Sequence, residues 1–487
     1  MVVESFFDQI YEDLEPFWGM APVNIRSSLT GWQWTLRIRA GKVKDVPQGR
    51  FRSRVWGDMI QRIAVDLPDM DVAINPLDEP RVFTPWSKID SLVKSASLQR
   101  HRTMSQPTDK MLRRQSMPMA ANTLKPPANH TWIKKGSLWP HLLETCDPSR
   151  LELKFDQHVP QYTSNWTTMK DICANHYWAD LHGSLTRPAT MDITTDLVPL
   201  FSAAKLQGSN DILLPPPSYY TDDALFTGNS WFGDGKGSVA WSKKIHGLVW
   251  RGKATGGHPQ NSSWQNSHRQ RLVSKLNASN PSPVWDGDST QWLGSENAQV
   301  DNLSFAKWLG SVASVGFTDL LCSKNTGQAC RAMSDHFSLL SPLAMRRQYR
   351  WKYLPDIDGN SLSGRFLAFL GSNSAPMKAT IFKEWHDSRL IPWVHFIPLD
   401  ITLRDLWHTM AYFLGFEEMQ IQAHDSEGER IAAEGRSWAK SALRKEDMEL
   451  YVHRVLLEYA RLCDDERDNL GFVEDLQAGR SGPGVHK

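Results

Sequence analysis

The chain has 487 residues, which is long enough for two or more domains. Its 55 Lys and Arg residues are balanced by 54 Asp and Glu residues, so the bulk charge gives no reason to expect a nucleic-acid partner. The 21 tryptophans fit a carbohydrate-handling cleft, because aromatic faces pack on sugar rings, although most tryptophans are simply core residues.

The N-terminus shows no targeting segment. Met1 leads almost directly into residues 6–11, FFDQIY, without a basic region or a long apolar run. No other stretch is apolar for long enough to span a bilayer, and the chain ends at Lys487 without a Lys-Asp-Glu-Leu retention signal. The sequence therefore predicts either a shortened chain or a cytosolic protein.

A helix followed by a strand is predicted before residue 75. One helical face carries the apolar residues Val55, Met59, Ile60, Ile63, Ala64 and Leu67. The alternation of Met70, Val72 and Ile74 then predicts a strand. Asp78 follows in an Asp-Glu-Pro sequence, which is typical of a turn. Because open α/β sheets bind ligands beyond the carboxyl ends of their strands, this is also a position for a site residue.

Residues 87–135 are strongly basic. They hold ten Lys or Arg residues and two Asp or Glu residues, a net charge of about +8, with frequent Ser, Met, Gln and Pro. The apolar periodicity is weak, so we expect a flexible loop that crosses between segments of the first domain. A basic patch that faces an acidic glycan is the alternative.

The most informative segment is the glycine-rich basic stretch at residues 251–257, RGKATGG. The apolar run at 248–250 predicts a buried strand before it, and residues 267–276 predict a helix after it. This order builds a phosphate cradle, because glycines let backbone amides approach an anion. The spacing matches neither a Walker loop nor a dinucleotide fingerprint. It predicts a nucleotide or sugar-nucleotide ligand, and an ordinary βα turn is the alternative.

A second loop of the same character lies at residues 356–365. The apolar residues after it have helical spacing: Leu362, Phe366, Phe369 and Leu370. Suitable N-cap residues precede this helix, namely Asn360, Ser361 and Ser363. Arg365 would then lie in the first turn, where an arginine beside a helix N-terminus suits a diphosphate. An ordinary capped core helix with a solvated Arg365 is the alternative.

The C-terminal part is predicted to be helical after one more strand. Residues 393–397 predict a strand, and Thr402 is expected to cap the helix that follows. A later helical stripe consists of Met448, Tyr451, Val452, Val455, Leu456, Tyr459 and Leu462. This stripe is expected to be core, and residues 464–487 to form a flexible tail.

Cysteines and glycosylation sequons fit an oxidising compartment. The five cysteines are Cys146, Cys173, Cys322, Cys330 and Cys463. Cys322 and Cys330 enclose a short polar loop and could form a disulfide, whereas no Cys-x-x-Cys pair suggests zinc. Asn-x-Ser/Thr sequons occur at Asn129, Asn165, Asn261, Asn277 and Asn302. This density suits a secretory-pathway protein.

Several motifs, in order along the chain, resemble glycosyltransferase family 90. They lie at residues 10–19, 67–80, 250–257, 268–272, 358–365 and 390–399. The family holds the Rumi-type protein O-glucosyltransferases and the fungal capsule-associated xylosyltransferases, and residues 371–385 resemble the fungal branch more closely. Because the first motif begins so near Met1, we favour the shortened chain over the cytosolic protein.

The resemblance implies an α/β protein with a GT-B fold, in which two Rossmann-like domains face a cleft. Residues 1–235 would form the acceptor-side domain, including the basic loop 87–135, and residues 236–415 the donor-binding domain. Helices at 416–463 would return to the first domain, before the tail at 464–487. The implied chemistry is inverting and needs no cofactor.

The resemblance also assigns roles to individual residues. Asp78 matches the catalytic base. The residues that match UDP-sugar-binding positions are Arg251, Gly252, Lys253, Thr255, Arg269, Asn360, Ser361, Ser363 and Arg365. Some family members carry a small hydroxyl residue at the position of Lys253. Without a metal, arginines and loop amides would have to stabilise the departing diphosphate.

Metal binding is the less favoured interpretation of two Asp-x-Asp sequences, at residues 69–71 and 356–358. The second fails as a calcium loop, because Ser361 and Leu367 stand where that loop needs Gly and Glu. The Asp-x-Asp pattern also resembles the manganese signature of the other large glycosyltransferase class, although a pattern this short often arises by chance.

The leading hypothesis is therefore an inverting transferase that moves xylose from UDP-xylose to a mannan-type glycan. UDP-glucose transfer to a protein serine is the second enzymatic hypothesis, since the two donors differ by one hydroxymethyl group. The family is expected in the lumen of the Golgi or endoplasmic reticulum. A different class is a catalytically inactive relative that binds carbohydrate or nucleotide sugar, or acts as a scaffold.

Overall fold

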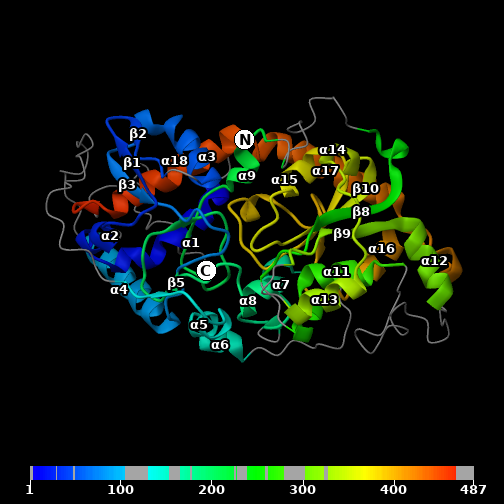
Figure 1. Ribbon diagram of the computed structural model, residues 1–487. Helices are drawn as coiled ribbons and strands as arrows, with labels where there is room; N and C mark the ends of the chain where they lie inside the picture. Colours follow the sequence, from blue (N-terminus) through cyan, green and yellow to red (C-terminus); the bar gives the residue numbers. More distant parts are fainter. Residues whose placement is uncertain are drawn as a thin grey trace.

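The computed structural model shows a mixed α/β protein (Figure 1). It describes residues 4–467 apart from 29, 48–49, 105–129, 153–164, 176–177, 224–225, 227–238, 258–260, 279–301 and 323–326. For residues 98–104, 261–263, 302 and 327, the backbone alone is described. Asn129, most of the predicted tail and the middle of the basic segment 87–135 therefore lie outside the described residues.

The second half of the chain is built on a five-stranded parallel sheet. Its strands are β8 (Ile245–Lys253), β9 (Ala313–Asp319), β10 (Trp351–Ile357), β11 (Ala375–Ala379) and β12 (Ile397–Leu399). The spatial order is β12-β11-β10-β8-β9, so the order of the strands along the chain reverses between β8 and β10. In open α/β sheets this reversal opens a crevice at the carboxyl ends of the two strands, where ligands bind.

Helices connect these strands and cover the sheet. They are α11 (His268–Lys275), α12 (Asn302–Val312), α13 (Gly327–His336), α14 (Met345–Gln348), α15 (Phe366–Gly371) and α16 (Leu406–Leu414). All residues of β11 and β12 are buried, as is expected for parallel strands that are covered on both faces. The predicted strand at 248–250 is thus confirmed as the centre of the longer β8, and the helix predicted at 267–276 as α11.

The first half contains shorter strands. An antiparallel sheet has the order β2 (Lys42–Lys44), β1 (Thr35–Arg39), β3 (Met70–Ala73). Two further pairs are β4 (Trp132–Ile133) with β5 (Ile193–Thr194), and β6 (Phe201–Ser202) with β7 (Ile212–Leu213). Single bridges join Ile74 to Phe201 and Val82 to Thr194. The segment after β3, which carries Asp78, is therefore tied to neighbouring strands at both ends.

Helices of 4 to 19 residues accompany these strands. They are α1 (Asp8–Leu14), α2 (Pro22–Ser28), α3 (Phe51–Gln61), α4 (Trp86–Met104), α5 (Trp139–Glu144), α6 (Pro148–Leu151), α7 (Trp166–Met169), α8 (Gly183–Thr186) and α9 (Pro217–Tyr220). The predicted helix before β3 is confirmed as α3 for its first part, which buries Val55, Met59 and Ile60. The helix ends at Gln61, before the remaining predicted positions Ile63, Ala64 and Leu67.

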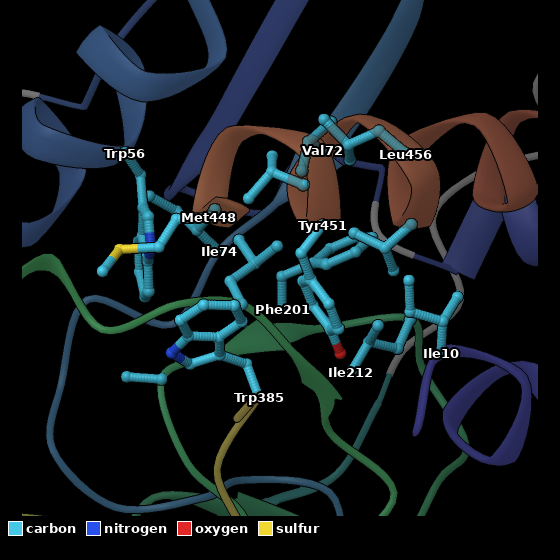
Figure 2. Packing of buried hydrophobic residues seen from close by; sticks show 14 of the residues in the cluster. Ile10, Trp56, Val72, Ile74, Phe201, Ile212, Trp385, Met448, Tyr451 and Leu456 are labelled. Carbon is cyan, nitrogen blue, oxygen red and sulfur yellow. The ribbon is translucent and has the colours of Figure 1, made fainter. Parts of the chain in front are cut away.

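The last two helices are α17 (Asp425–Ala442) and α18 (Lys445–Leu462). In Figure 1, α18 lies beside α3 and the strands β1 to β3, although these segments are far apart in the sequence. Figure 2 shows Met448, Tyr451 and Leu456 of α18 in one cluster with Val72 and Trp56 of the first half. The predicted apolar stripe is thus confirmed as core, and it closes the core of the first half of the chain.

The expected loop at residues 87–135 is wrong for its first part, because residues up to Met104 belong to α4. This helix packs on the 3-10 turn Glu15–Gly19 and buries Ala96, with Ile89 and Leu92 against the core. These apolar residues have the spacing of one helical face, and their burial stabilises the helix. The many charged residues of this segment had suggested a loop instead.

Three element boundaries also differ from prediction. The helix expected from Leu362 begins at Phe366, so Arg365 is its N-cap rather than part of its first turn. The helix expected after Thr402 begins at Leu406, with Asp405 as N-cap. The strand expected at 393–397 is a turn followed by β12, and Trp393 has a positive φ of 64° that a strand cannot contain.

Two disulfides are present. Cys322 is bonded to Cys330, as predicted, and Cys146 is bonded to Cys173, which the sequence analysis did not find. Cys463 is buried and not disulfide-bonded. Among the described residues, no helix combines the length and apolar character that crossing a bilayer requires.

Candidate active site

The loops after β8 and β10 meet at the point where the strand order reverses. The side-chain oxygen Oδ1 of Asn360 accepts hydrogen bonds from the backbone amides of Gly256, at 3.0 Å, and Gly257, at 3.5 Å. The two glycine-bearing segments that the sequence singled out are therefore parts of one site.

Close packing explains why residues 256 and 257 are glycines. Gly256 has a φ of +110°, and a Cβ atom there would lie 2.2 Å from Cε1 of His268. A Cβ atom on Gly257 would lie 2.6 Å from the carbonyl oxygen of Gly183, at the start of α8. A side chain at either position would collide with its neighbours, so the loop depends on glycine for its shape.

Arg269 and Arg365 both lie near the end of β8. Their guanidinium carbons are 5.6 Å and 5.7 Å from the ring centroid of Trp250, a distance typical of cation–π contacts. Arg269 donates to the carbonyl oxygens of Lys253, at 2.8 Å, and Asp358, at 2.6 Å. Arg365 donates to the carbonyl oxygen of Arg251 at 2.8 Å. Both guanidinium groups are thereby fixed in orientation.

Carboxylates lie near these two arginines but do not pair with them directly. Among the described residues, no ion pair involves Arg269 or Arg365. Burial, and then the nearby charge of Arg365, lower the pKa of Arg269 to about 9. The charges of Asp358 and Asp356 act in the opposite direction on Arg269, and that of Asp356 does so on Arg365. Guanidinium groups of fixed orientation are suited to bind an anionic group, such as a diphosphate.

The side chains of Arg251 and Lys253 lie elsewhere. The Arg251 guanidinium donates to the carbonyl and hydroxyl oxygens of Ser314 on β9, at 2.7 Å and 2.9 Å. The Lys253 ammonium pairs with Asp319 at 3.3 Å and is well exposed. Both residues contribute backbone carbonyls to the arginine pair, and Gly252 between them makes room for the ring of Trp250.

The remaining predicted donor residues build the loop itself. Thr255 lies against Gly359, where a Cβ atom would be 3.2 Å from the threonine hydroxyl. Ser361 and Ser363 are buried. The hydroxyl of Ser361 accepts from the Leu362 amide at 2.6 Å, and the carbonyl of Ser363 accepts from the Tyr219 hydroxyl at 2.8 Å.

Asp78 reaches this site from the first half of the chain. Its Oδ2 accepts a hydrogen bond of 3.2 Å from the side-chain amide of Asn360, and its Oδ1 pairs with Arg52 of α3. Burial raises the pKa of Asp78, but the charge of Arg52 and the hydrogen bonds from Arg52 and Asn360 outweigh it, so the pKa lies below its usual value. The carboxylate is therefore ionised at neutral pH and remains partly accessible.

A buried polar network supports the loop of Asp78. Arg81 is fully buried and donates to Asn75, at 3.1 Å, and to Thr190, at 3.0 Å. The carboxylate of Asp211 accepts from the backbone amides of Arg81 and Val82. The sequence analysis missed these residues, since most of their partners are more than a hundred positions away.

Two stacked histidines support the donor loop. His182 and His268 are fully buried, with ring centroids 3.8 Å apart and nearly parallel planes. Nε2 of His268 lies 2.8 Å from the Asp358 carbonyl, and Nε2 of His182 lies 3.4 Å from the Asp358 carboxylate. Burial lowers the pKa of both histidines, so both rings are neutral at pH 7. No sequence pattern indicated that residue 182 would lie here.

Both Asp-x-Asp sequences are occupied by protein contacts. Asp356 pairs with Lys378 at 3.2 Å, and Asp358 accepts from the Ile381 amide at 2.9 Å. Asp69 accepts from a backbone amide, and Asp71 pairs with Arg39. Within the described part of the chain, no group of three or more His, Cys, Asp or Glu side chains could hold a metal ion.

Comparison with known proteins decides the family. The model of Glycosyl transferase family 90 matches residues 184–468, which is more than half of the chain. The chain belongs to glycosyl transferase family 90. This membership confirms the resemblance found in the sequence motifs.

Curated relatives match shorter segments. The chain is 28% identical over 168 residues to Protein O-glucosyltransferase 2 of Danio rerio, which is 32% of each chain. It is 27% identical over 113 residues to Protein O-glucosyltransferase 3 of Rattus norvegicus, covering 23% of this chain and 21% of the relative. Protein O-glucosyltransferase 3 of Homo sapiens is 26% identical over 113 residues, with the same coverage. The alignments thus span about a third or less of these relatives.

The family match includes the loops after β8 and β10 but begins after Asp78. Its range contains the glycines 256 and 257, both arginines and Asn360. Asp78 lies outside this range, and its connection to the matched region is the hydrogen bond from Asn360.

Proposed function

We propose that this protein is an inverting glycosyltransferase that moves a sugar from a UDP-sugar to a hydroxyl group of a glycan or protein. One observation carries the proposal: Asp78 lies within hydrogen-bond reach of Asn360, whose side chain also binds the glycine loop at the donor crevice. A base and an anion site are thus next to each other. The proposed architecture is of the GT-B type, with residues 1–235 and 236–415 as the two sides of the cleft.

The donor diphosphate would bind at the carboxyl ends of β8 and β10. The guanidinium groups of Arg269 and Arg365 would contact its oxygens, whereas the amides of Gly256 and Gly257 donate to Asn360 and so shape the neighbouring loop. The guanidinium groups stabilise negative charge that grows on the leaving diphosphate, which is the largest electrostatic demand of the reaction. The two arginines would supply the compensating positive charge without a cofactor, and manganese remains a less favoured addition.

Asp78 would act as the general base. Its carboxylate takes the proton of the acceptor hydroxyl while the acceptor oxygen forms a bond to the anomeric carbon. The bond from that carbon to the diphosphate breaks, and UDP leaves with the electron pair. A single displacement of this kind inverts the configuration at the anomeric carbon. The lowered pKa of Asp78 keeps the base ionised at neutral pH.

Xylose and glucose are the two donor sugars that we propose. The motifs of the fungal branch favour xylose, whereas the names of the curated relatives favour glucose. The two disulfides and the sequons support a place in the lumen of the secretory pathway, because disulfides persist in oxidising compartments.

Release of UDP from a panel of UDP-sugars tests the proposal. The purified protein is incubated with each donor, with and without a mannose-type glycan or a serine-containing protein acceptor. We expect acceptor-dependent UDP release with UDP-xylose or UDP-glucose, and a product of inverted anomeric configuration. Donor binding without turnover on any acceptor would instead support the catalytically inactive relative. Absence of UDP binding would refute the anion site.

A further inference from the structure

The side chain of Asn360 connects the two functional loops. Its Oδ1 accepts from the amides of Gly256, at 3.0 Å, and Gly257, at 3.5 Å, while its Nδ2 donates to Asp78 at 3.2 Å. Backbone amides can only donate hydrogen bonds, so the oxygen of the carboxamide has to face the glycine loop. The NH₂ group then has to face Asp78. The position of the glycine loop therefore sets the direction of the hydrogen bond to the base.

The backbone at Asn360 is fixed as well. Its carbonyl oxygen accepts from the hydroxyl of Ser184 on α8 at 2.6 Å, and the neighbouring Gly359 amide donates to the Ser361 carbonyl at 2.7 Å. With both main chain and side chain held, Asn360 has little freedom to rotate away from Asp78. The loop after β10 is thus a rigid support for the contact.

We infer that Asn360 is a positioning residue that couples the donor loop to the catalytic base. The amides of Gly256 and Gly257 orient the carboxamide, which in turn holds Asp78 toward the sugar. This inference rests on the proposed function. Asp78 still accepts a proton in this arrangement, because each carboxylate oxygen has two lone-pair positions and only one is used by Asn360 or Arg52.

The groups around Asp78 determine in which direction its pKa changes when Asn360 is substituted. Burial opposes the ionised carboxylate, whereas Arg52 on α3, the amide of Asn360 and Arg81 on the loop of Asp78 favour it. The charge of Asp78 in turn raises the pKa of the neighbouring Glu79. Removal of the Asn360 amide therefore raises the pKa of Asp78. An aspartate at position 360 raises it further, since it adds a negative charge. A base works when it is deprotonated, so the acidic limb of the pH–rate profile moves to higher pH.

Two variants and a control test the coupling. The pH dependence of kcat/KM is measured for the wild type, Asn360→Ala and Asn360→Asp, with the UDP-sugar that supports turnover. We expect the acidic limb to move to higher pH in the order wild type, Asn360→Ala, Asn360→Asp. The control is Ser184→Ala, which removes the support of the Asn360 backbone but keeps the carboxamide. It is expected to lower rates equally at every pH, without moving the limb.

Labelling of carboxyl groups separates failure of this inference from failure of the proposed function. If the wild type turns over no donor, the proposed function is wrong. Carbodiimide labelling of Asp78, followed by peptide mass spectrometry across a pH series, then still reports the ionisation of the carboxylate in the folded protein. Higher midpoints in both Asn360 variants support the coupling. Midpoints and acidic limbs equal to those of the wild type overturn it.

Discussion

At the scale of single residues, the proposed donor site requires arginine rather than lysine at position 365. Arg365 presents a planar guanidinium beside Trp250 and is fixed by the Arg251 carbonyl. A lysine in its place would keep the charge but lose the bidentate fork and the stacking. We expect Arg365→Lys to weaken UDP binding by roughly 10- to 100-fold, since a hydrogen bond to a charged group contributes about 1.5–3 kcal/mol.

Isothermal calorimetry with UDP measures this loss directly. The matched control is Arg37→Lys, because Arg37 lies on β1 and pairs with Asp45 in a half-exposed position. Its UDP affinity should equal that of the wild type. Equal affinities for Arg365→Lys and the wild type would remove Arg365 from the donor site.

Residue roles could be predicted from the sequence only where a motif carried them. Asp78 and Arg269 were found by resemblance, and in the structure both contact the loop after β10, Asp78 through Asn360 and Arg269 through the carbonyl of Asp358. Alternation along β8 could have shown that the side chains of Arg251 and Lys253 share a face opposite to Trp250. Nothing in the sequence could pair Arg52 with Asp78, because that contact depends on how α3 packs beside the loop.

At the scale of elements, the donor loop depends on a glycine that packing requires. Gly256 has a positive φ, and a Cβ atom added there would lie 2.2 Å from Cε1 of His268. Gly31 has a φ of +81° but no atom within 4 Å of such a Cβ. An alanine at position 31 would therefore cause backbone strain alone, whereas an alanine at position 256 would cause both backbone strain and a steric collision.

We expect Gly31→Ala to lower the free energy of unfolding by about 1 kcal/mol, the cost of a left-handed alanine. Gly256→Ala should cost more, because His268 must also move, and it should weaken UDP binding. Urea denaturation and calorimetry on both variants measure these effects. A Gly256→Ala protein with the stability loss of Gly31→Ala and unchanged UDP affinity would contradict this description of the loop.

Elements with clear periodicity could be predicted, and elements with conflicting signals could not. The stripe of α18 and the alternation of β3 were found correctly. The helix α4 was not predicted, because its many charged residues suggested a loop. Its apolar residues Ile89, Leu92 and Ala96 nevertheless have helical spacing. β12 was displaced in the prediction, because a short apolar run with two buried faces has no alternation to mark its start.

At the scale of the whole molecule, the disulfides should set much of the stability. Cys146 and Cys173 are separated by 27 positions, and Cys322 and Cys330 by 8. By loop-closure entropy, removal of the first bond should cost about 3.5 kcal/mol and of the second about 2.5 kcal/mol. Thermal unfolding of Cys146→Ser and Cys330→Ser, with and without reductant, measures both.

The buried Cys463 supplies the control for these measurements. Cys463 forms no disulfide. Reductant should therefore destabilise Cys463→Ser by as much as it destabilises the wild type, in addition to the loss caused by the substitution itself. In contrast, reductant should have a smaller effect on each disulfide variant than on the wild type. If reductant leaves the wild type unchanged while its thiols become free, the bonds do not stabilise the fold.

The arrangement of the two halves was the part least accessible to sequence reasoning. The family resemblance implied a cleft, but the contact between Asp78 and Asn360 joins residues 282 positions apart. Likewise, α18 completes a core with Val72 and Ile10 from the start of the chain. Contacts of this kind depend on the packing of the complete chain and leave no local pattern in the sequence.

The central claim is that Asp78 is the base of a sugar transfer at the donor crevice. Asp71 offers a matched control, because it is another partly exposed aspartate in an ion pair with an arginine, 46% exposed against 39% for Asp78. UDP release and donor affinity should be measured on the wild type, Asp78→Asn and Asp71→Asn. We predict that Asp78→Asn alone loses turnover, by roughly 10²- to 10⁴-fold, with donor affinity retained. Turnover by Asp78→Asn at the wild-type rate would contradict the account.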